Sequence, residues 1–212
     1  IGAMMGSKNL KGIVAVGTSE VEVADPGKVR ELTFKLLELE LQAPGQNVRY
    51  GTTYWTYAAS HGFSDDACWN YREGTNDDSA LQMSGYAIEP YWVRHSACRH
   101  CPLHCKKIGI VRVGDYKCVF EGPDYELNVQ IGVNWDLRDT EAHLYTTWLV
   151  DDLGIDGISF GNTIAFLMEC MQRGWLTPAD LGGITLKWNP NVKETIAKIA
   201  VWTAYREGPK TF

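Results

Sequence analysis

Several features that would place a chain in a particular class are missing from this sequence. Its 212 residues contain no run of 18 apolar residues, which excludes a membrane-spanning helix. No segment reads as a signal peptide, and no internal repeat or low-complexity tract is visible. Positive charge is scarce, with 20 Lys and Arg against 26 Asp and Glu, so the net charge of −6 argues against a nucleic-acid partner. Apolar residues make up 45% and charged residues 22%, which is the balance of a soluble globular protein.

The two ends of the sequence also lack the features of natural termini. The chain opens on Ile1 without a leader, a capping residue or a polar tail, and residues 208–212 stop just after a helix-like segment. We therefore expect the chain to be an internal piece of a longer protein. A processed or tagged chain is the alternative.

Cysteines are the most informative residues in the sequence. Six of them could form three disulfides in a secreted protein, but a core of this size does not need such cross-links. Three fall within eight residues, in the run Cys98-x-x-Cys101-x-x-x-Cys105, and this clustering points to metal or redox chemistry in a cytoplasmic protein. The other three are Cys68, Cys118 and Cys170, and no motif marks any of them as a fourth ligand.

The spacing of the clustered cysteines allows three sulfur atoms to converge on one small object. A [4Fe–4S] cluster takes four thiolates, often three from a compact run and one from far away. A structural zinc site is the main alternative, because zinc also takes three cysteines and one histidine, and inert buried thiols are a third. The run is surrounded by histidines and by cations that would raise the reduction potential of a cluster: His95, His100, His104, Arg99, Lys106 and Lys107.

Helices dominate the expected secondary structure. The apolar run at residues 12–17 predicts a buried strand. Asp25 and Pro26 are suited to the start of a helix that runs to about Gln42, and residues 45–95, rich in Gly and aromatic residues, are typical of surface loops that could line a substrate pocket. Further helices are predicted at residues 140–153, from the cap Asp156 to about 174, in a short turn after 177, and from 189 to about 207.

Two acidic motifs follow the cysteine run. Residues 121–126 place three carboxylates around a Gly-Pro turn, where burial near a metal centre would suit proton transfer, although these residues by themselves favour a solvated acidic turn. Residues 151–156 join two helices, with Gly154 ending one and Asp156 capping the next. The free backbone N–H groups at such a helix start also bind polar rings or phosphates.

Taken together, four segments of the chain resemble the aldehyde:ferredoxin oxidoreductase family. Residues 2–11 resemble its G-A-x-M-G-S-K-N-L-K segment, and residues 98–105 resemble its C-x-x-C-P-x-x-C run. Residues 121–126 resemble E-G-P-E-Y-E, and residues 151–169 resemble D-x-x-G-x-D followed by a helix of the family form. The matches occur in the family's order over most of the chain, which makes the combination far more specific than any one segment.

The resemblance implies roles for the residues of these motifs. Cys98, Cys101 and Cys105 would be three of the four ligands of a [4Fe–4S] cluster, and Glu126 matches the glutamate proposed to act in proton transfer with the aldehyde. The motif that holds one of two pterin cofactors is matched by Asp151, Gly154 and Asp156. In the family the pterins carry tungsten or molybdenum, and the resemblance also admits Mg²⁺.

The implied reaction is the oxidation of an aldehyde by water to a carboxylic acid, with two electrons passing through the cluster to ferredoxin. The resemblance implies a mainly α fold. Residues 1–23 would end the N-terminal β-rich pterin-binding domain, and residues 24–212 would form a helical middle domain that is incomplete on its C-terminal side. A homodimer or a larger redox complex is compatible with the family.

The sequence departs from the family pattern in three ways. The second D-x-x-G-[LI]-C motif, which carries the fourth cluster ligand, is not found, nor is the catalytic histidine of the last domain or the first-pterin region. We therefore expect the fragment alone to be inactive. A subunit of a benzoyl-CoA-reductase-like ring reductase and a non-catalytic zinc-binding module are the alternative functions, and a cluster-bearing protein without pterin is a third.

Overall fold

A computed structural model describes residues 2–19, 21–42, 46–99 and 101–209. The chain divides into two compact units, Ile1–Gly45 and Gln46–Phe212, of which the second holds nearly all of the tertiary structure. No helix in the described ranges is long and apolar enough to cross a membrane.

The first unit contains two helices, α1 (Gly2–Ser7) and α2 (Pro26–Gln42). The predicted start of α2 is confirmed, because the Oδ1 atom of Asp25 accepts a hydrogen bond of 2.9 Å from the backbone N–H of Lys28. The predicted strand at residues 12–17 is wrong: these residues carry no regular secondary structure and their side chains are exposed. An apolar run becomes a buried strand only when neighbouring strands satisfy its backbone, and the described part of this unit contains none.

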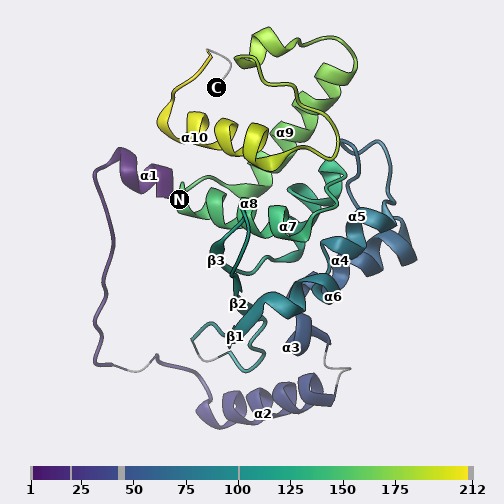
Figure 1. Ribbon diagram of the computed structural model, residues 1–212. Coiled ribbons are helices and arrows are strands. Elements are labelled where there is room, and N and C mark those ends of the chain that lie inside the picture. Colours follow the sequence, from purple (N-terminus) through teal and green to yellow (C-terminus); the bar gives the residue numbers. More distant parts are fainter. Residues whose placement is uncertain (1, 20, 43–45, 100, 210–212) are drawn as a thin grey trace. The chain divides into compact units, whose positions relative to one another are not determined.

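The second unit is mainly helical, as predicted (Figure 1). Residues 46–63 and 77–91, predicted as loops, instead form short helices, so the prediction was wrong there. Residues 64–76 between them are irregular apart from an isolated bridge between Cys68 and Glu73. The α-helices of the unit are α3 (Gln46–Tyr50), α4 (Tyr54–Ala58), α5 (Asp77–Gln82), α6 (Gly85–Ile88), α7 (Tyr125–Gln130), α8 (Thr140–Asp152), α9 (Gly157–Gln172) and α10 (Ala197–Tyr205). Short 3₁₀ or π segments are Gly51–Thr53, Ala59–Phe63, Glu89–Tyr91, Val133–Trp135, Pro178–Leu181 and Val192–Ile196.

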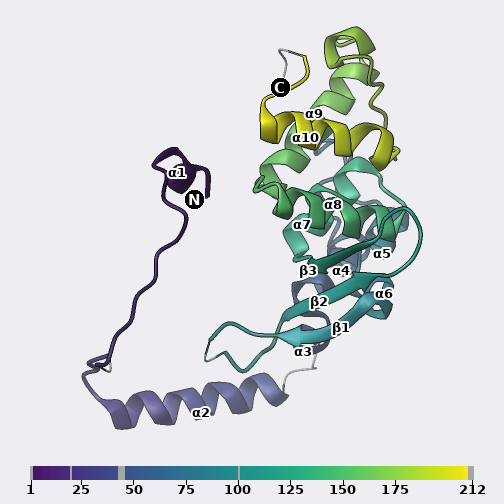
Figure 2. The ribbon, with the colours of Figure 1, turned by 60° about the vertical axis from the view of Figure 1, so that its left-hand side comes forward.

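One small sheet, which the sequence analysis did not predict, lies within this helical unit. Its strands β1 (Trp92–Ser96), β2 (Lys106–Val111) and β3 (Cys118–Glu121) are antiparallel and lie in the order β1-β2-β3 (Figure 2). His95 pairs with Lys107 across the first two strands. Helix α8 packs against β3, so the sheet is attached to the main helical core.

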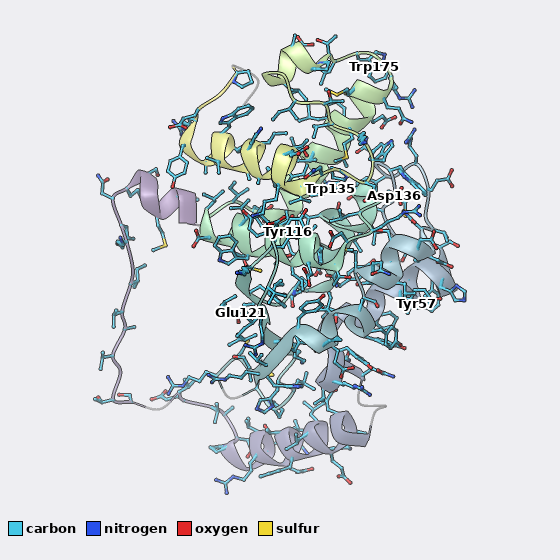
Figure 3. The ribbon with its side chains drawn as sticks, viewed as in Figure 1. Tyr57, Tyr116, Glu121, Trp135, Asp136 and Trp175 are labelled. Atoms are coloured by element: carbon cyan, nitrogen blue, oxygen red, sulfur yellow. The ribbon has the colours of Figure 1, made fainter. Side chains whose placement is uncertain are left out.

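Helices α7, α8 and α9 surround that core. The indole of Trp135, labelled in Figure 3, is fully buried and its Nε1–H donates a hydrogen bond of 2.8 Å to the carbonyl of Gly161 on α9. Gly161 has to be glycine for steric reasons, since a Cβ atom there would lie 2.6 Å from the carbonyl oxygen of Gln130 at the end of α7. Backbone contact between α7 and α9 therefore sets the spacing of the core.

The helix boundaries that the sequence predicted around α8 and α9 are confirmed. Gly154 adopts the left-handed conformation, with φ of +70°, directly after α8. Asp156 caps α9, with its Oδ2 atom accepting a hydrogen bond of 2.8 Å from the N–H of Ser159. The last helix begins slightly later than predicted, because Asn191 and not Asn189 supplies the cap, to the N–H of Glu194.

A buried polar chain also joins three of the helices. The Nε2 atom of His143 on α8 lies 2.8 Å from the amide oxygen of Asn128 on α7, whose Nδ2 group donates to Thr56 on α4 at 3.0 Å. All three side chains are fully buried. Because the amide oxygen can only accept, His143 donates from Nε2, and desolvation lowers its pKa to about 4.

Candidate functional site

The three clustered cysteines lie between β1 and β2, on a loop of which residues 97–99 and 101–105 are described (Figure 2). All three thiols are free; Cys98 is exposed, and Cys101 and Cys105 are half-buried. A single turn is formed within the loop by the backbone N–H of Cys101, which donates to the carbonyl of Cys98 at 3.0 Å. The three thiols therefore lie on one short loop beyond the paired strands β1 and β2.

Lys107, the second residue of β2, holds the end of this loop in place. Its side chain is only 2% exposed, although lysine is rarely buried. The Nζ group donates to the backbone carbonyls of Val48 at 3.0 Å, His104 at 3.0 Å and Cys105 at 3.1 Å. All three protons of the ammonium group thus have acceptors, and they tie the loop to α3.

A backbone contact strengthens the same connection. Gly51 follows α3 with φ of +65°, and a Cβ atom at this position would overlap the carbonyl oxygen of Cys105. Only glycine permits both the conformation and the approach. Cys105 is therefore held by backbone contacts, whereas the side chain of Cys98 is exposed.

No group of three or more His, Cys, Asp or Glu side chains is already arranged to hold a metal ion within the described parts of the chain. His100, one of the histidines considered for zinc, lies outside the described residues. Three free, accessible thiols on one short loop nevertheless suit the thiolate chemistry of an iron–sulfur cluster. The donor set fits three corners of such a cluster, and a fourth ligand has to come from elsewhere.

Glu126 lines an open pocket of about 520 Å³. It lies in the first turn of α7, and its side chain is exposed. We call this hollow the Glu126 pocket; apart from Glu126 it is lined by Thr52, Trp55, Ala59, Phe63, Asp65 and Tyr125. Its wall combines apolar and aromatic surface with two carboxylates and two hydroxyl groups, a combination suited to binding a small organic molecule.

A buried carboxyl group lies behind the wall of the Glu126 pocket. Tyr125 donates from its hydroxyl to the Oδ1 atom of Asp66 at 3.1 Å. Asp66 is 5% exposed, and desolvation raises its pKa to about 7, although the hydrogen bond from Tyr125 acts in the opposite direction. Desolvation also raises the pKa of Tyr125.

The fold brings Asp151 close to the other predicted motifs. Partial desolvation raises the pKa of this carboxyl at the end of α8; the nearby cation of Lys106 acts against the shift, and the carboxylates of Glu121 and Asp124 add to it. Lys106 also lies 3.7 Å from the Oδ2 atom of Asp124. Residues following the cysteine loop, the acidic turn and α8 therefore share one electrostatic environment.

The other two residues of the predicted pterin motif lie nearby in the chain. Gly154 forms the turn between α8 and α9, and Asp156 lines a hollow of about 310 Å³ together with Ser159 and Thr163. The carboxylate of Asp156 is already engaged in capping α9, which lowers its pKa. The rest of this hollow is mainly apolar, lined by Ile155, Phe160, Ile164 and Ile199, so the pterin-binding role of the motif stays a prediction.

Sequence reasoning named Lys107 only as a cation near the cysteines, so it missed the buried role of Lys107, and it missed Asp66 entirely. Lys107 could have been found from the alternation of β2, which buries Lys107, Gly109 and Val111 on one face, had the strand itself been recognised. Asp66 offers no comparable signal, because it lies in an irregular segment and meets Tyr125 across 59 residues of chain. Only the tertiary fold reveals that contact.

Comparison with known proteins completes the description of the site. Residues 34–211 match the family model described as "Aldehyde ferredoxin oxidoreductase, domains 2 & 3". The chain belongs to the aldehyde ferredoxin oxidoreductase family. The match covers the cysteine loop, the Glu126 pocket and the motif around Gly154, so the features described above are parts of a chain of this family.

Curated relatives of the family align with most of the chain. An "Aliphatic sulfonate oxidoreductase, WOR-like subunit" from Pyrococcus furiosus is 34% identical over 98% of this chain and 33% of its own length. Tungsten-containing aldehyde ferredoxin oxidoreductases from Pyrococcus abyssi and Pyrococcus furiosus are 34% and 33% identical, each over 86% of this chain and 30% of its own length. The chain thus spans about a third of the length of the curated relatives it matches.

Proposed function

We propose that this chain is part of an oxidoreductase that converts aldehydes to carboxylic acids at a tungsten-pterin centre and passes electrons through a [4Fe–4S] cluster to ferredoxin. The observation that carries the proposal is the presence of a three-thiol loop and a carboxylate-lined pocket within one chain of this family. The names of its tungsten-containing relatives support the metal and the class of substrate. Molybdenum in place of tungsten is the alternative metal.

Each motif then has a distinct task. Cys98, Cys101 and Cys105 hold three corners of the cluster, a role supported by their being free thiols on one short loop. The turn between α8 and α9 holds a pterin through Gly154 and Asp156, with Asp151 beside it. When bound, the metal-pterin group supplies the two-electron redox chemistry, while the protein orients the substrate and handles protons.

Glu126 acts on protons in the proposed reaction. Oxidation of an aldehyde by water to a carboxylic acid releases two electrons and two protons, so a base is needed where the substrate binds. Glu126 is an exposed carboxylate on a pocket whose aromatic wall includes Trp55 and Phe63. A carboxylate positioned in this way can accept a proton from water or from the substrate.

A second candidate function is the oxidation of aliphatic sulfonates. It is favoured by the P. furiosus sulfonate oxidoreductase subunit, whose alignment extends over 98% of this chain and not 86%. Both functions need the same electron path, so they differ in the substrate that the Glu126 pocket accepts. The division into the end of an N-terminal domain (residues 1–23) and a helical middle domain (24–212) is also part of the proposal. So is a cytoplasmic location, which the six free cysteines support.

The metal content of the full-length protein, expressed without oxygen, tests the proposal. We expect about four iron atoms and one tungsten or molybdenum atom per chain, and the substitution Cys101→Ser should lower the iron content and alter the electron paramagnetic resonance of the cluster. One zinc atom without iron would overturn the iron–sulfur function. Assays with panels of aldehydes and aliphatic sulfonates, coupled to ferredoxin, then separate the two candidate substrates.

Glu126→Gln tests the proton-transfer role. The substitution keeps the size of the side chain and removes the base, so kcat should fall about 100-fold or more while metal content is unchanged. Glu121→Gln is the matched control, because Glu121 belongs to the same acidic motif, is exposed, and does not line the pocket. Wild-type kcat in the Glu126→Gln enzyme would exclude the role.

A further inference from the structure

Asp66 is the most unusual titratable group outside the predicted motifs. Its side chain is 5% exposed, its Oδ1 atom accepts the hydroxyl of Tyr125, and its Oδ2 atom is buried without a hydrogen-bond partner among the described residues. A fully ionised carboxylate would be strongly destabilised with a single donor. A neutral carboxyl group, carrying its proton on Oδ2, fits this environment better.

The groups that face Asp66 also favour its neutral form. Asp65 and Asp77 add negative charge, and Tyr125 and the buried thiol of Cys68 are neutral neighbours. Of the cations nearby, Arg72 lines the same hollow as Asp66 but donates to the carbonyl of Trp69 and to Gln172, and His61 is paired with Asp77 at 2.7 Å. With the pKa raised to about 7 by desolvation, Asp66 is able to gain and lose a proton near neutral pH.

Asp66 lies between two hollows. Through Tyr125 it reaches the Glu126 pocket, since Tyr125 forms part of that wall. Asp66 itself lines a second hollow of about 410 Å³, together with Ser64, Asp65 and Arg72. The second hollow is open and polar, so it can hold water in contact with solvent.

We propose that Tyr125 and Asp66 form a proton relay from the Glu126 pocket to the second hollow. The inference rests on the proposed function, because it assigns an exit to the protons that substrate oxidation releases. The proton on Oδ2 of Asp66 first leaves to a water from the second hollow. Oδ1 of the resulting carboxylate then accepts the hydroxyl proton of Tyr125 while a proton from the Glu126 pocket binds to the hydroxyl oxygen. Charge and atoms balance at each step, and rotation of the carboxyl group and the hydroxyl returns both residues to their starting state.

Tyr125 takes part in this relay without becoming a phenolate. Its hydroxyl accepts one proton as it donates another, and the raised pKa of the group opposes full ionisation. Removing the hydroxyl therefore interrupts the relay, even though the ring still fills the pocket wall. Tyr125→Phe removes only the hydroxyl group and is therefore the first test variant; Asp66→Asn is the second.

Infrared spectroscopy of the full-length protein tests the protonation of Asp66 without turnover. Wild type should show a carbonyl band of a buried protonated carboxyl that disappears as the pH rises through about 7. The band should be absent in Asp66→Asn and shifted in Tyr125→Phe. If Asp66→Asn removes no band from the wild-type spectrum, Asp66 is not protonated and the relay is overturned.

Turnover measurements test the transfer itself. In Tyr125→Phe and Asp66→Asn, kcat should fall at least about tenfold with KM changed less than about threefold, and small buffer acids should restore part of the rate in Asp66→Asn. Tyr71→Phe is the matched control: Tyr71 lines the second hollow and its hydroxyl accepts from Gln130, but it has no contact with Asp66 among the hydrogen bonds of the described residues. Wild-type kcat and pH dependence in both relay variants would also overturn the proposal.

The two measurements separate failure of the relay from failure of the proposed function. If wild type contains no tungsten or molybdenum and oxidises none of the substrates, the proposed function fails, and with it the relay as an exit for oxidation protons. If wild type is active and Glu126→Gln is impaired while both relay variants match Tyr71→Phe, only the relay fails.

Discussion

Lys107 connects the cysteine loop to the helical layer beneath it through three backbone carbonyls. The substitution Lys107→Met preserves the length and the apolar part of the side chain but leaves these carbonyls without their donor. Because unsatisfied buried acceptors cost about 1–3 kcal/mol each, we expect the free energy of unfolding to fall by roughly 3 kcal/mol. Urea denaturation of the metal-free protein measures this change independently of the cluster.

Lys106→Met is the control for that experiment. Lys106 precedes Lys107 on the same strand but is half-exposed and forms only a loose ion pair with Asp124. Such pairs contribute less than about 1 kcal/mol. Equal losses in the two variants would show that the contacts of Lys107 have no special role.

The raised pKa of Asp66 predicts that the stability of the protein falls as the pH rises. Its folded pKa is raised to about 7 from the ordinary value of 3.8, so between these values the folded chain keeps a proton that the unfolded chain releases. The contribution of Asp66 is therefore fully present below about pH 4 and is lost as the pH rises to about 7, with a total of up to about 4 kcal/mol. Urea denaturation of wild type and Asp66→Asn at a series of pH values should show this slope only in wild type; parallel curves would contradict it.

At the scale of elements, the contact between α7 and α9 gives a prediction of unusual sign. Gly to Ala inside a helix normally stabilises it by about 1 kcal/mol. At Gly161 the added methyl group would lie 2.6 Å from the carbonyl oxygen of Gln130, so Gly161→Ala should destabilise the protein by about 2 kcal/mol. Thermal unfolding measures the effect, and Asn162→Ala, at the next and less buried position of α9, is the control.

The same elements show why some structure was predictable. Helices α2, α8 and α9 were predicted because their limits depend on local residues, namely Asp25, Gly154 and Asp156. The sheet was not, because its strands pair across the cysteine loop and no short-range pattern announces that pairing. The apolar run at residues 12–17 has the composition of a strand, yet its partners are not present among the described residues.

The site divides in the same way. The cysteine loop and Glu126 were found from motifs with fixed spacing, because the residues of each motif lie close together in the sequence. Contacts made across long stretches of chain, such as Asp66 with Tyr125 or Lys107 with Val48, require the fold. The position of the fourth cluster ligand is not set by this loop, because that ligand comes from elsewhere in the protein.

For the whole molecule, the two units should differ in hydrogen exchange. Amides of residues 11–18 have no regular hydrogen-bonded structure and their side chains are exposed, whereas α8 and α9 carry much of the buried core. Amides of the core helices should therefore exchange at least about 1,000-fold more slowly than those of residues 11–18. Mass spectrometry after timed deuterium labelling measures both, and slow exchange at 11–18 would reveal pairing that the structure does not contain.

The unequal anchoring of the cysteine loop has a further consequence for how a cluster would be built. Cys105 is immobilised by Lys107 and Gly51, while Cys98 at the opposite end is exposed. Both ends of the loop leave paired strands, since Ser96 pairs with Lys106, but only Cys105 is also held by the helical layer. A cluster would then bind first to the thiol already held in place at Cys105, and an insertion would be tolerated better before Cys101 than after it.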